Sequence, residues 1–330
     1  MAILYITQQG AVLHKSGNQI IVKKERDVLQ EIPIVQLDEV VIFGNGHITT
    51  PTMGYLLDKN IPVSFLSSQG KYKGKLQPAY AKDTLIRQRQ YAVASDPPQC
   101  LELAKCFVRG KITNAIRFSQ RQRTQNAEVK AATHAARQTL GKLDRAKNLE
   151  SLLGYEGSGA AAHYRAFREL LTHDWGFTNR QFRPPPDPIN AMLSLGYTLL
   201  HNHVYTFANV VGLDPYCGYF HQPKHGHAAL ASDLMEEFRQ IIVDGYVLSL
   251  VNNNRVRPED FEQTNKGIRF TKEALDRFLT GYYGRMQQTF QHPTRNEKTT
   301  YLRSIELQVR HLARVITGED PEYKPFLIRA

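Results

Sequence analysis

Short apolar segments separated by turn residues fill the first part of the chain. Six segments are rich in β-branched or aromatic side chains, and Gly10, Gly17 and Gly44 lie between them. The segments cover residues 3–6, 11–14, 19–22, 32–34, 39–43 and 62–66. Their spacing of about ten residues predicts a small antiparallel β-sandwich, whereas residues 51–60 have the pattern of a short helix.

The pattern changes near residue 79, where apolar residues begin to recur three or four positions apart, as in amphipathic helices. This period predicts helices over residues 83–92, 99–125, 128–150, 147–171, 189–211, 229–248, 272–290 and 298–317. We therefore expect an α+β protein in two parts. A small N-terminal β-sandwich domain covers residues 1–78, and a larger all-α C-terminal domain covers residues 79–330, with a linker near residues 70–82.

The balance of charges indicates an anionic partner. The 330 residues include 42 Lys and Arg against 31 Asp and Glu, so the formal net charge is +11 and the isoelectric point is near 9.5. Such an excess favours nucleic acid first and a membrane surface second. The many basic residues on the predicted helices from 83 to 125 form either a surface for a nucleic-acid backbone or an ordinary solvated face.

Other features of the sequence predict a cytoplasmic protein without membrane attachment. We find no run of eighteen or more apolar residues, and the first ten residues lack the basic region and cleavage site of a secretion signal. The cysteines are only three, an odd and sparse set that suits a reducing compartment better than a disulfide framework.

The predicted helix over residues 147–171 carries a carboxylate on an apolar face. Leu153, Glu156, Ala160, His163 and Phe167 recur at helical spacing, and only the glutamate and the histidine are polar. A carboxylate in that position loses solvent and requires a cation or a hydrogen-bond donor. The alternative is a frayed helix start with a solvated glutamate. Three glycines around it would weaken the helix but allow another backbone to approach closely.

A loop followed by a helix, over residues 214–240, holds the other candidate ligands. His221 lies on the loop, and Asp233 and Glu236 are neighbours on the helix surface because they are three residues apart. One imidazole and two carboxylates are ligand types for a divalent metal. Two alternatives stay open: Asp233 and Glu236 form an N-terminal capping pattern, or His221, His225 and His227 form a zinc cluster.

Four long motifs, in this order, resemble one known family. They are Leu-Gly-Tyr-Glu-Gly-Ser-Gly-Ala-Ala from Leu153, the stretch from Arg183 to Leu200, the stretch from Leu213 to His221, and Ser-Asp-Leu-Met-Glu-Glu-Phe-Arg from Ser232. Together they resemble the CRISPR-associated endonuclease and integrase of the spacer-acquisition module. The resemblance covers nearly the whole chain.

This resemblance implies a fold, a reaction and a set of ligands. The family has an N-terminal β domain and a helical catalytic domain, and it inserts short foreign DNA segments, called spacers, into a CRISPR repeat array by attack of a 3′-hydroxyl on a phosphodiester. Glu156, His221 and Glu236 match its catalytic metal ligands, for Mg²⁺ or Mn²⁺, and Asp233 matches an auxiliary acid beside the metal.

The resemblance also implies partners. The family forms a homodimer, in which we assign dimerisation to the N-terminal domain. Two such dimers flank a central dimer of a smaller second adaptation protein in a heterohexamer. Its substrates are double-stranded DNA, both the prespacer and the repeat. Arg183, Lys224 and Arg239 lie near the ligands in the sequence and are our candidate DNA contacts. The competing functions are a non-catalytic basic DNA-binding scaffold and a zinc hydrolase that uses His221, His225 and His227.

Overall fold

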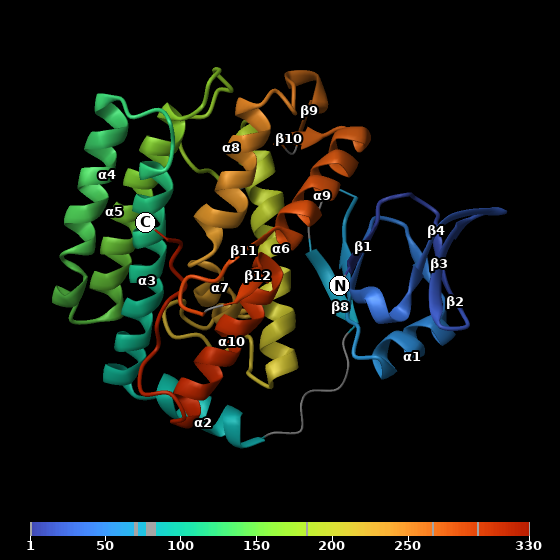
Figure 1. Cartoon of the computed structure of the whole chain (residues 1–330), viewed down its shortest axis with the longest axis horizontal. Helices are drawn as coiled ribbons and strands as arrows, with labels where there is room; N and C mark the ends of the chain where they lie inside the picture. The colour runs from blue at the N-terminus through green and yellow to red at the C-terminus, as the bar shows by residue number, and fades with distance from the viewer. Residues whose placement is uncertain are drawn as a thin grey trace. The chain divides into compact units, whose positions relative to one another are not determined.

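A computed structural model describes residues 2–68, 72–76, 84–182, 184–265, 267–295 and 297–329. The chain divides into two compact units, which are coloured along the chain in Figure 1. The first unit comprises Met1–Tyr80 and Leu275–Tyr283, and the second comprises Ala81–Ala274 and Gly284–Ala330. The short second segment of the first unit comes from a helix that the sequence pattern places wholly in the C-terminal domain.

The first unit contains two four-stranded sheets, with strand orders β1-β5-β7-β8 and β4-β3-β2-β6. Its strands are β1 Ala2–Ile6, β2 Val12–Ser16, β3 Gln19–Lys24, β4 Asp27–Pro33, β5 Leu37–Phe43, β6 His47–Ile48, β7 Val63–Leu66 and β8 Tyr72–Leu76. The prediction of purely antiparallel pairing was wrong, because β1 pairs with β5, β5 with β7, and β2 with β6 in parallel. Parallel neighbours require a crossover connection, and helix α1, Thr50–Asp58, lies in the one between β5 and β7.

Both sheets of the first unit contribute to a single hydrophobic core. Leu4 and Val40 come from one sheet, Leu13 and Ile20 come from the other, and Leu56 of α1 is buried with them. The predicted linker near residues 70–82 was partly wrong, because β8 lies within it and pairs with β7 in antiparallel fashion. The rest of that linker, residues 70–71 and 77–82, lies outside the described residues.

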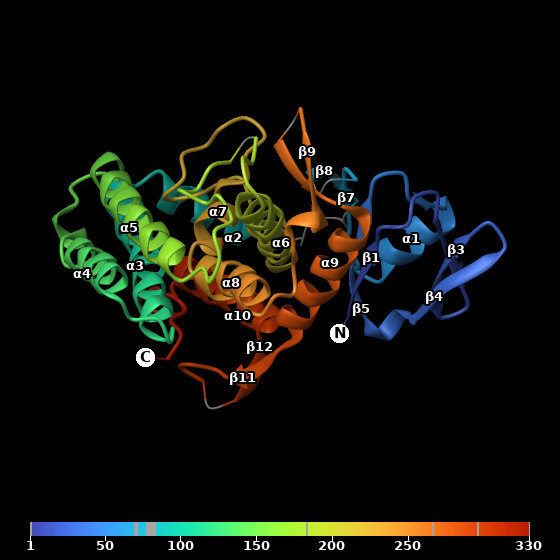
Figure 2. The ribbon, with the colours of Figure 1, turned by 90° about the horizontal axis from the view of Figure 1, so that it is seen from above.

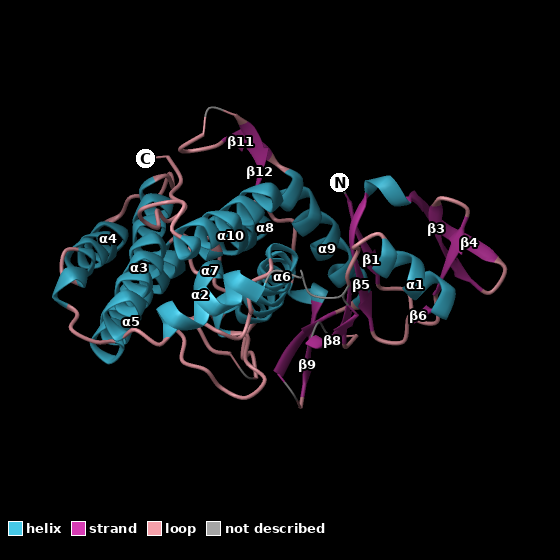
Figure 3. Ribbon diagram, turned by 90° about the horizontal axis from the view of Figure 1, so that it is seen from below, coloured by secondary structure: helices cyan, strands magenta, loops and turns pink. Residues whose placement is uncertain are grey.

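The second unit is mainly helical, as Figure 3 shows, but the prediction of an all-α domain was wrong. Two short hairpins interrupt the helices: β9 Phe261–Thr264 with β10 Gly267–Phe270, and β11 Thr289–Gln291 with β12 Lys298–Thr300. The helices are α2 Thr84–Ala94, α3 Pro97–Gln120, α4 Ala127–Leu140, α5 Leu149–Glu169, α6 Pro188–Val211, α7 Ala229–Met235, α8 Gly245–Asn252, α9 Lys272–Gln287, whose middle part belongs to the first unit, and α10 Tyr301–Thr317.

Helix α3 connects two groups of helices in the second unit. It packs against α4 and α5 on one side, and it also contacts α7 and the segment that follows α7 (Figure 2). Helix α6 contacts α7 and α10 in the second group. Asp96 caps the start of α3 by accepting a hydrogen bond from the Gln99 amide over 3.1 Å, and Asn148 caps α5 in the same way. The residues of α3 therefore lie where the two groups meet.

Three predicted helices end well before their sequence patterns indicate, and the one predicted over 99–125 ends at Gln120. The helix predicted over 128–150 stops at Leu140, just before Gly141, and a short 3₁₀ turn, Leu143–Arg145, precedes α5. The helix predicted over 229–248 breaks after Met235, continues as a π-helical turn, Arg239–Asp244, and becomes α8 at Gly245. None of the helices in the described ranges is long and apolar enough to cross a bilayer.

Candidate active site

Glu156 lies on α5 where that helix closely approaches α3. Gly159, one turn further along α5, faces Ile112 of α3, and a Cβ added at Gly159 would lie 2.7 Å from the Cδ1 atom of Ile112. This close packing brings the Glu156 carboxylate into contact with the ammonium of Lys111, the residue before Ile112. The Glu156 side chain is 14% exposed, so the expected need for a cation is met by Lys111.

The buried face of α5 differs from the predicted one at its first turn. Leu152, His163 and Phe167 are buried, whereas Leu153 is 57% exposed. The polar contact of Glu156 therefore lies at the edge of the apolar stripe rather than in its middle. Of the three glycines near Glu156, Gly159 allows the close approach of α3, whereas Gly154 and Gly157 have open space around them.

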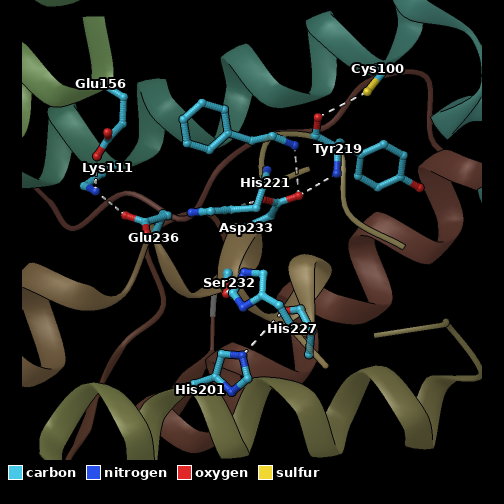
Figure 4. Close-up of polar contacts among 12 residues, drawn as sticks. Cys100, Lys111, Glu156, His201, Tyr219, His221, His227, Ser232, Asp233 and Glu236 are labelled. Carbon is cyan, nitrogen blue, oxygen red and sulfur yellow. Dashed lines mark hydrogen bonds and ion pairs between the residues drawn. The ribbon is translucent and has the colours of Figure 1, made fainter. Parts of the chain in front are cut away.

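Lys111 joins two acidic residues that are far apart in the sequence. Its Nζ atom contacts Glu156 and also lies 2.5 Å from the Oε2 atom of Glu236, and the lysine side chain is only 9% exposed (Figure 4). Burial lowers the pKa of Lys111, but Glu236 and Glu156 outweigh that effect, so the pKa lies above its ordinary value. Lys111 therefore carries a positive charge between two carboxylates.

Glu236 lies at the break after α7 and is surrounded by cations. Its Oε1 atom accepts a hydrogen bond from Arg239 Nη1 over 3.0 Å, and its side chain is 5% exposed. Burial raises the pKa of this carboxyl, but Arg239, Lys111 and His221 together lower it below its ordinary value. The other oxygen, Oε2, faces the Lys111 ammonium.

Asp233 holds the loop that carries His221. Its Oδ2 atom accepts hydrogen bonds from the Tyr219 and Phe220 amides over 2.6 and 3.0 Å, and its Oδ1 atom accepts from the His221 amide over 2.8 Å. The N-terminal capping alternative was wrong, because Asp233 lies inside α7, whose N-cap is Ala228. Gly218 makes this closeness possible, since a Cβ there would lie 2.9 Å from Asp233 Oδ2.

The same carboxylate orients the His221 ring. His221 Nδ1 lies 2.7 Å from Asp233 Oδ1, and because a carboxylate only accepts, the proton between them belongs to Nδ1. The neutral ring therefore keeps its Nε2 lone pair available. Burial lowers the pKa of His221, but the Asp233 hydrogen bond and charge and the Glu236 charge raise it above its ordinary value. Figure 4 shows the ring between the Asp233 and Glu236 carboxylates.

Arg239 is fixed inside the site rather than exposed on a surface. Its guanidinium lies 4.0 Å from the centre of the Tyr197 ring, and its side chain is 13% exposed. Tyr197 donates a hydrogen bond to Asp244 at the end of the π-helical turn, and Asp244 Oδ2 lies 2.7 Å from His163 Nε2. This buried network fixes the Tyr197 ring, which the Arg239 guanidinium contacts.

The remaining predicted residues lie outside this cluster or outside the described residues. Lys224 and His225 are exposed on the loop before α7, and Arg183 is not among the described residues. His227 Nε2 is 3.3 Å from Ser232 Oγ, and its ring centre is 5.9 Å from that of His221. Within the described part of the chain, no group of three His, Cys, Asp or Glu residues is arranged as a metal-ligand set. The zinc alternative therefore has no structural support.

Glu156, His221 and Glu236, our predicted metal ligands, are likewise not arranged as a metal-ligand set. The structure brings the two glutamates together on Lys111 and places His221 within electrostatic reach of Glu236, but the three residues do not form a closed ligand set. Lys111 is the functional residue that sequence reasoning missed. Its signal is visible, because Phe107, Lys111, Ala115 and Phe118 share one face of α3 and only the lysine is polar.

A buried cluster of carboxylates, an imidazole and cations with shifted pKa values is the kind of arrangement found at functional sites. Comparison with known proteins identifies the family. The model of the family described as CRISPR associated protein Cas1 matches residues 4–284. CRISPR-associated endonuclease Cas1 3 from Thermus thermophilus is 36% identical to this chain, over 100% of this chain and 98% of the relative. The chain belongs to the Cas1 family, and the predicted class of CRISPR-associated nuclease and integrase enzymes is confirmed.

Two solved structures are similar over the whole fold. One is a casposase bound to integration product, with a TM-score of 0.85 and 25% identity over 98% of this chain and 93% of the other. The other is a Cas6-RT-Cas1–Cas2 complex, with a TM-score of 0.86 and 25% identity over 100% of this chain and 36% of the longer one. They confirm the α+β architecture, with strands concentrated at the N-terminus and helices in the C-terminal part.

Proposed function

We propose that this chain inserts short double-stranded DNA segments into a CRISPR repeat array, using a divalent metal and attack of a DNA 3′-hydroxyl on a phosphodiester. The observation that carries the proposal is the convergence of Glu156 and Glu236, from different helices, on one buried positive charge next to His221. Water in place of the hydroxyl would give the endonuclease reaction at the same site. The similarity to a casposase bound to integration product supports strand transfer as the chemistry.

The donor set suits Mg²⁺ or Mn²⁺. Carboxylate oxygens of Glu156 and Glu236 are hard ligands, and the Nε2 atom of His221 adds the nitrogen ligand that Mn²⁺ accepts readily. Asp233 fixes the tautomer and the orientation of the imidazole, as partners of metal-binding histidines commonly do. When bound, the ion would lower the pKa of the attacking hydroxyl and stabilise charge on the phosphoryl oxygens.

The chain's own cations prepare the site for a phosphodiester. Arg239 is held between Glu236 and the Tyr197 ring, so its guanidinium does not need to be ordered when DNA arrives. Lys111 supplies a second positive charge next to both glutamates. Lys224 is exposed on the loop beside His221 and is available for phosphate contacts, which would make DNA affinity fall as salt rises.

We also propose the partners that the family resemblance implies. The first unit, whose two sheets share one core as in a β-sandwich, would pair two copies of the chain. Two such dimers would flank a smaller second adaptation protein and bind the prespacer and repeat DNA. The similar structure of a Cas1–Cas2 complex and the net charge of +11 support a protein partner and a DNA partner.

A strand-transfer assay tests the proposal. A labelled short duplex with free 3′-hydroxyl ends is incubated with a plasmid that carries a repeat, the second adaptation protein, and Mg²⁺ or Mn²⁺. We expect label to enter the plasmid, and we expect Glu156→Gln, His221→Ala and Glu236→Gln to abolish this transfer while DNA binding persists. Glu150→Gln is the matched control, because Glu150 is an exposed acid on the first turn of the same helix as Glu156.

Four results would count against the proposal or a part of it. Transfer that continues with a chelator present, or with duplexes whose 3′ ends lack the hydroxyl, would exclude the proposed chemistry. Full activity of Glu156→Gln would remove that residue from the site. DNA binding without any transfer, under every metal condition, would favour the basic scaffold instead.

A further inference from the structure

Three separate elements meet at one ammonium group in the second unit. Lys111 is on α3, Glu156 is on α5, and Glu236 follows the end of α7. The Lys111 Nζ atom contacts Oε1 of Glu156 and Oε2 of Glu236, and all three side chains are largely buried. The structure thus contains a cation at the centre of its acidic residues.

A buried pair of carboxylates needs such a charge. Two carboxylates that share a poorly hydrated site repel each other, and removal of their counter-ion leaves uncompensated buried charge. Arg239 compensates Glu236 through the other oxygen, Oε1, but among the described residues it forms no ion pair with Glu156. Among the described residues, Lys111 is therefore the group that holds these two glutamates together.

The lysine uses oxygens that a metal would also need. An ion that bridged Glu156 and Glu236 would bind on the side where their carboxylates approach each other, which is where Nζ lies. The ammonium and the ion carry charges of the same sign, so they cannot both occupy that position. The four-carbon stem of lysine is flexible, which allows Nζ to move while the backbone of α3 stays in place.

We propose that Lys111 is a built-in counter-ion, which keeps Glu156 and Glu236 assembled before metal binds and gives up its contacts with them when the ion arrives. This inference rests on the proposed function, because it concerns the same metal site. It makes Lys111 a positioning residue, which acts through the two glutamates. Metal binding then exchanges one ion pair for another instead of gathering distant carboxylates from solvent.

Thermal unfolding of full-length Lys111→Met, with and without Mn²⁺, tests the exchange. Methionine keeps most of the length of the side chain and removes its charge. We expect the metal-free variant to unfold at a lower temperature than the parent protein, and we expect Mn²⁺ to raise its Tm by more than it raises that of the parent. In a calorimetric titration, the variant should bind Mn²⁺ at least tenfold more tightly, because no ammonium has to leave.

Lys105→Met is the matched control. Lys105 is also a buried lysine on α3, but its Nζ atom pairs with Glu102 of the same helix over 2.8 Å. Its replacement should leave both the Mn²⁺ affinity and the Mn²⁺-induced rise in Tm unchanged. Equal Mn²⁺ responses of the parent and Lys111→Met would overturn the inference, and so would weaker Mn²⁺ binding by Lys111→Met.

A second variant covers the case in which Lys111→Met does not fold without metal. The double variant Lys111→Met/Glu156→Gln has one buried carboxylate fewer, so it should fold, and a double-mutant cycle should show coupling between the two positions in metal-free protein. If this double variant is no more stable than Lys111→Met, the inference is wrong. A failure of the proposed function would give a different result. In that case Mn²⁺ would change the Tm of the parent protein, Glu156→Gln and Glu236→Gln by the same amount.

Discussion

Two consecutive glutamates, both buried, have opposite environments. Glu236 faces Lys111, Arg239 and His221, and their charges lower the pKa of its carboxyl. Glu237 faces the C-terminal tail, where it accepts hydrogen bonds from the Tyr323 hydroxyl and the Phe326 amide, each over 2.7 Å. No cation from the described part of the chain contributes there, and burial raises the pKa of Glu237 from its ordinary value of 4.5 to about 8.

Residues on adjacent turns of helix α3 contact both glutamates. Lys111 provides the charge for the Glu236 carboxylate, and Asn114, three residues later, binds the Glu237 carbonyl and the Phe326 carbonyl through Nδ2 over 2.8 and 2.7 Å. The comparison shows that burial alone does not determine the charge of an acid. The neighbouring groups decide whether it serves a charged site or a structural anchor.

The largest expected effect is a difference in strand-transfer activity between variants of the two glutamates. Glu236→Gln removes a proposed metal ligand, so we expect transfer to fall by at least about 1,000-fold, which is roughly 4 kcal/mol of transition-state stabilisation. Glu237→Gln should keep transfer within about tenfold, because the described hydrogen bonds of the Glu237 carboxylate go to the tail. We call the hydrogen bonds of Glu237 and Asn114 with the C-terminal tail the tail anchor. Comparable losses of activity in the two variants would mean that the tail anchor is part of the catalytic machinery.

The next effect concerns the tail anchor itself. Asn114→Ala removes the two bonds from Nδ2 and the bond that Oδ1 accepts from the Ile328 amide over 3.0 Å. Because the partners are buried and lose their hydrogen bonds, we expect the free energy of unfolding in urea to drop by about 3 kcal/mol. Asn253→Ala is the control, since its exposed amide bonds only within its own helix end, and its cost should stay below about 0.5 kcal/mol.

A third effect is the pH dependence that Glu237 should impose. Between its unfolded pKa near 4.5 and its folded pKa of about 8, the folded protein holds a proton that the unfolded chain has lost. The free energy of unfolding should therefore fall as pH rises through this window, by at most about 1.4 kcal/mol per pH unit, and level off above it. Glu237→Gln does not titrate, so its unfolding curves from pH 5 to 8 should lack this slope. An unchanged slope would show that Glu237 ionises normally.

The smallest effect should come from one hydroxyl. Tyr323→Phe removes the donor to Glu237 Oε1 and the acceptor of the Gln308 side chain, both in the interior. We expect a loss of about 1–2 kcal/mol in the free energy of unfolding, measured in urea at pH 7. Tyr216→Phe, at an exposed tyrosine, should change it by less than about 0.5 kcal/mol. No difference between the two variants would remove Tyr323 from the anchor.

The periodicity of apolar residues predicted most helices within a few residues. It failed where long-range pairing decides the structure. Parallel pairing of β1, β5 and β7 depends on a crossover, which local alternation of residues does not reveal. The hairpins β9–β10 and β11–β12 are too short to produce a strand pattern.

The site was predicted by residue type but not by arrangement. Because Glu156 is on an apolar helix face, the sequence predicted that its carboxylate needs a cation or a hydrogen-bond donor. That cation, Lys111, is on another helix, so helical spacing could not identify it. The spacing of Asp233 and Glu236 suggested one shared role, whereas the structure uses Asp233 for the His221 loop and Glu236 for the cation cluster. The sequence does not indicate a role for Glu237, because its hydrogen bond with the Phe326 amide forms only when the C-terminal tail folds back.

The π-helical turn after Glu237 has a consequence for how this region tolerates insertions and deletions. A wide turn accommodates one residue more than an α-helical turn, and each residue added to or removed from a helix rotates what precedes it by about 100°. Loss of a single residue between Arg239 and Asp244 would thus swing the two glutamates around the helix axis relative to α8. The carboxylate now beside Lys111 would turn away, so sequences with a shortened turn should be inactive even when every named side chain is retained.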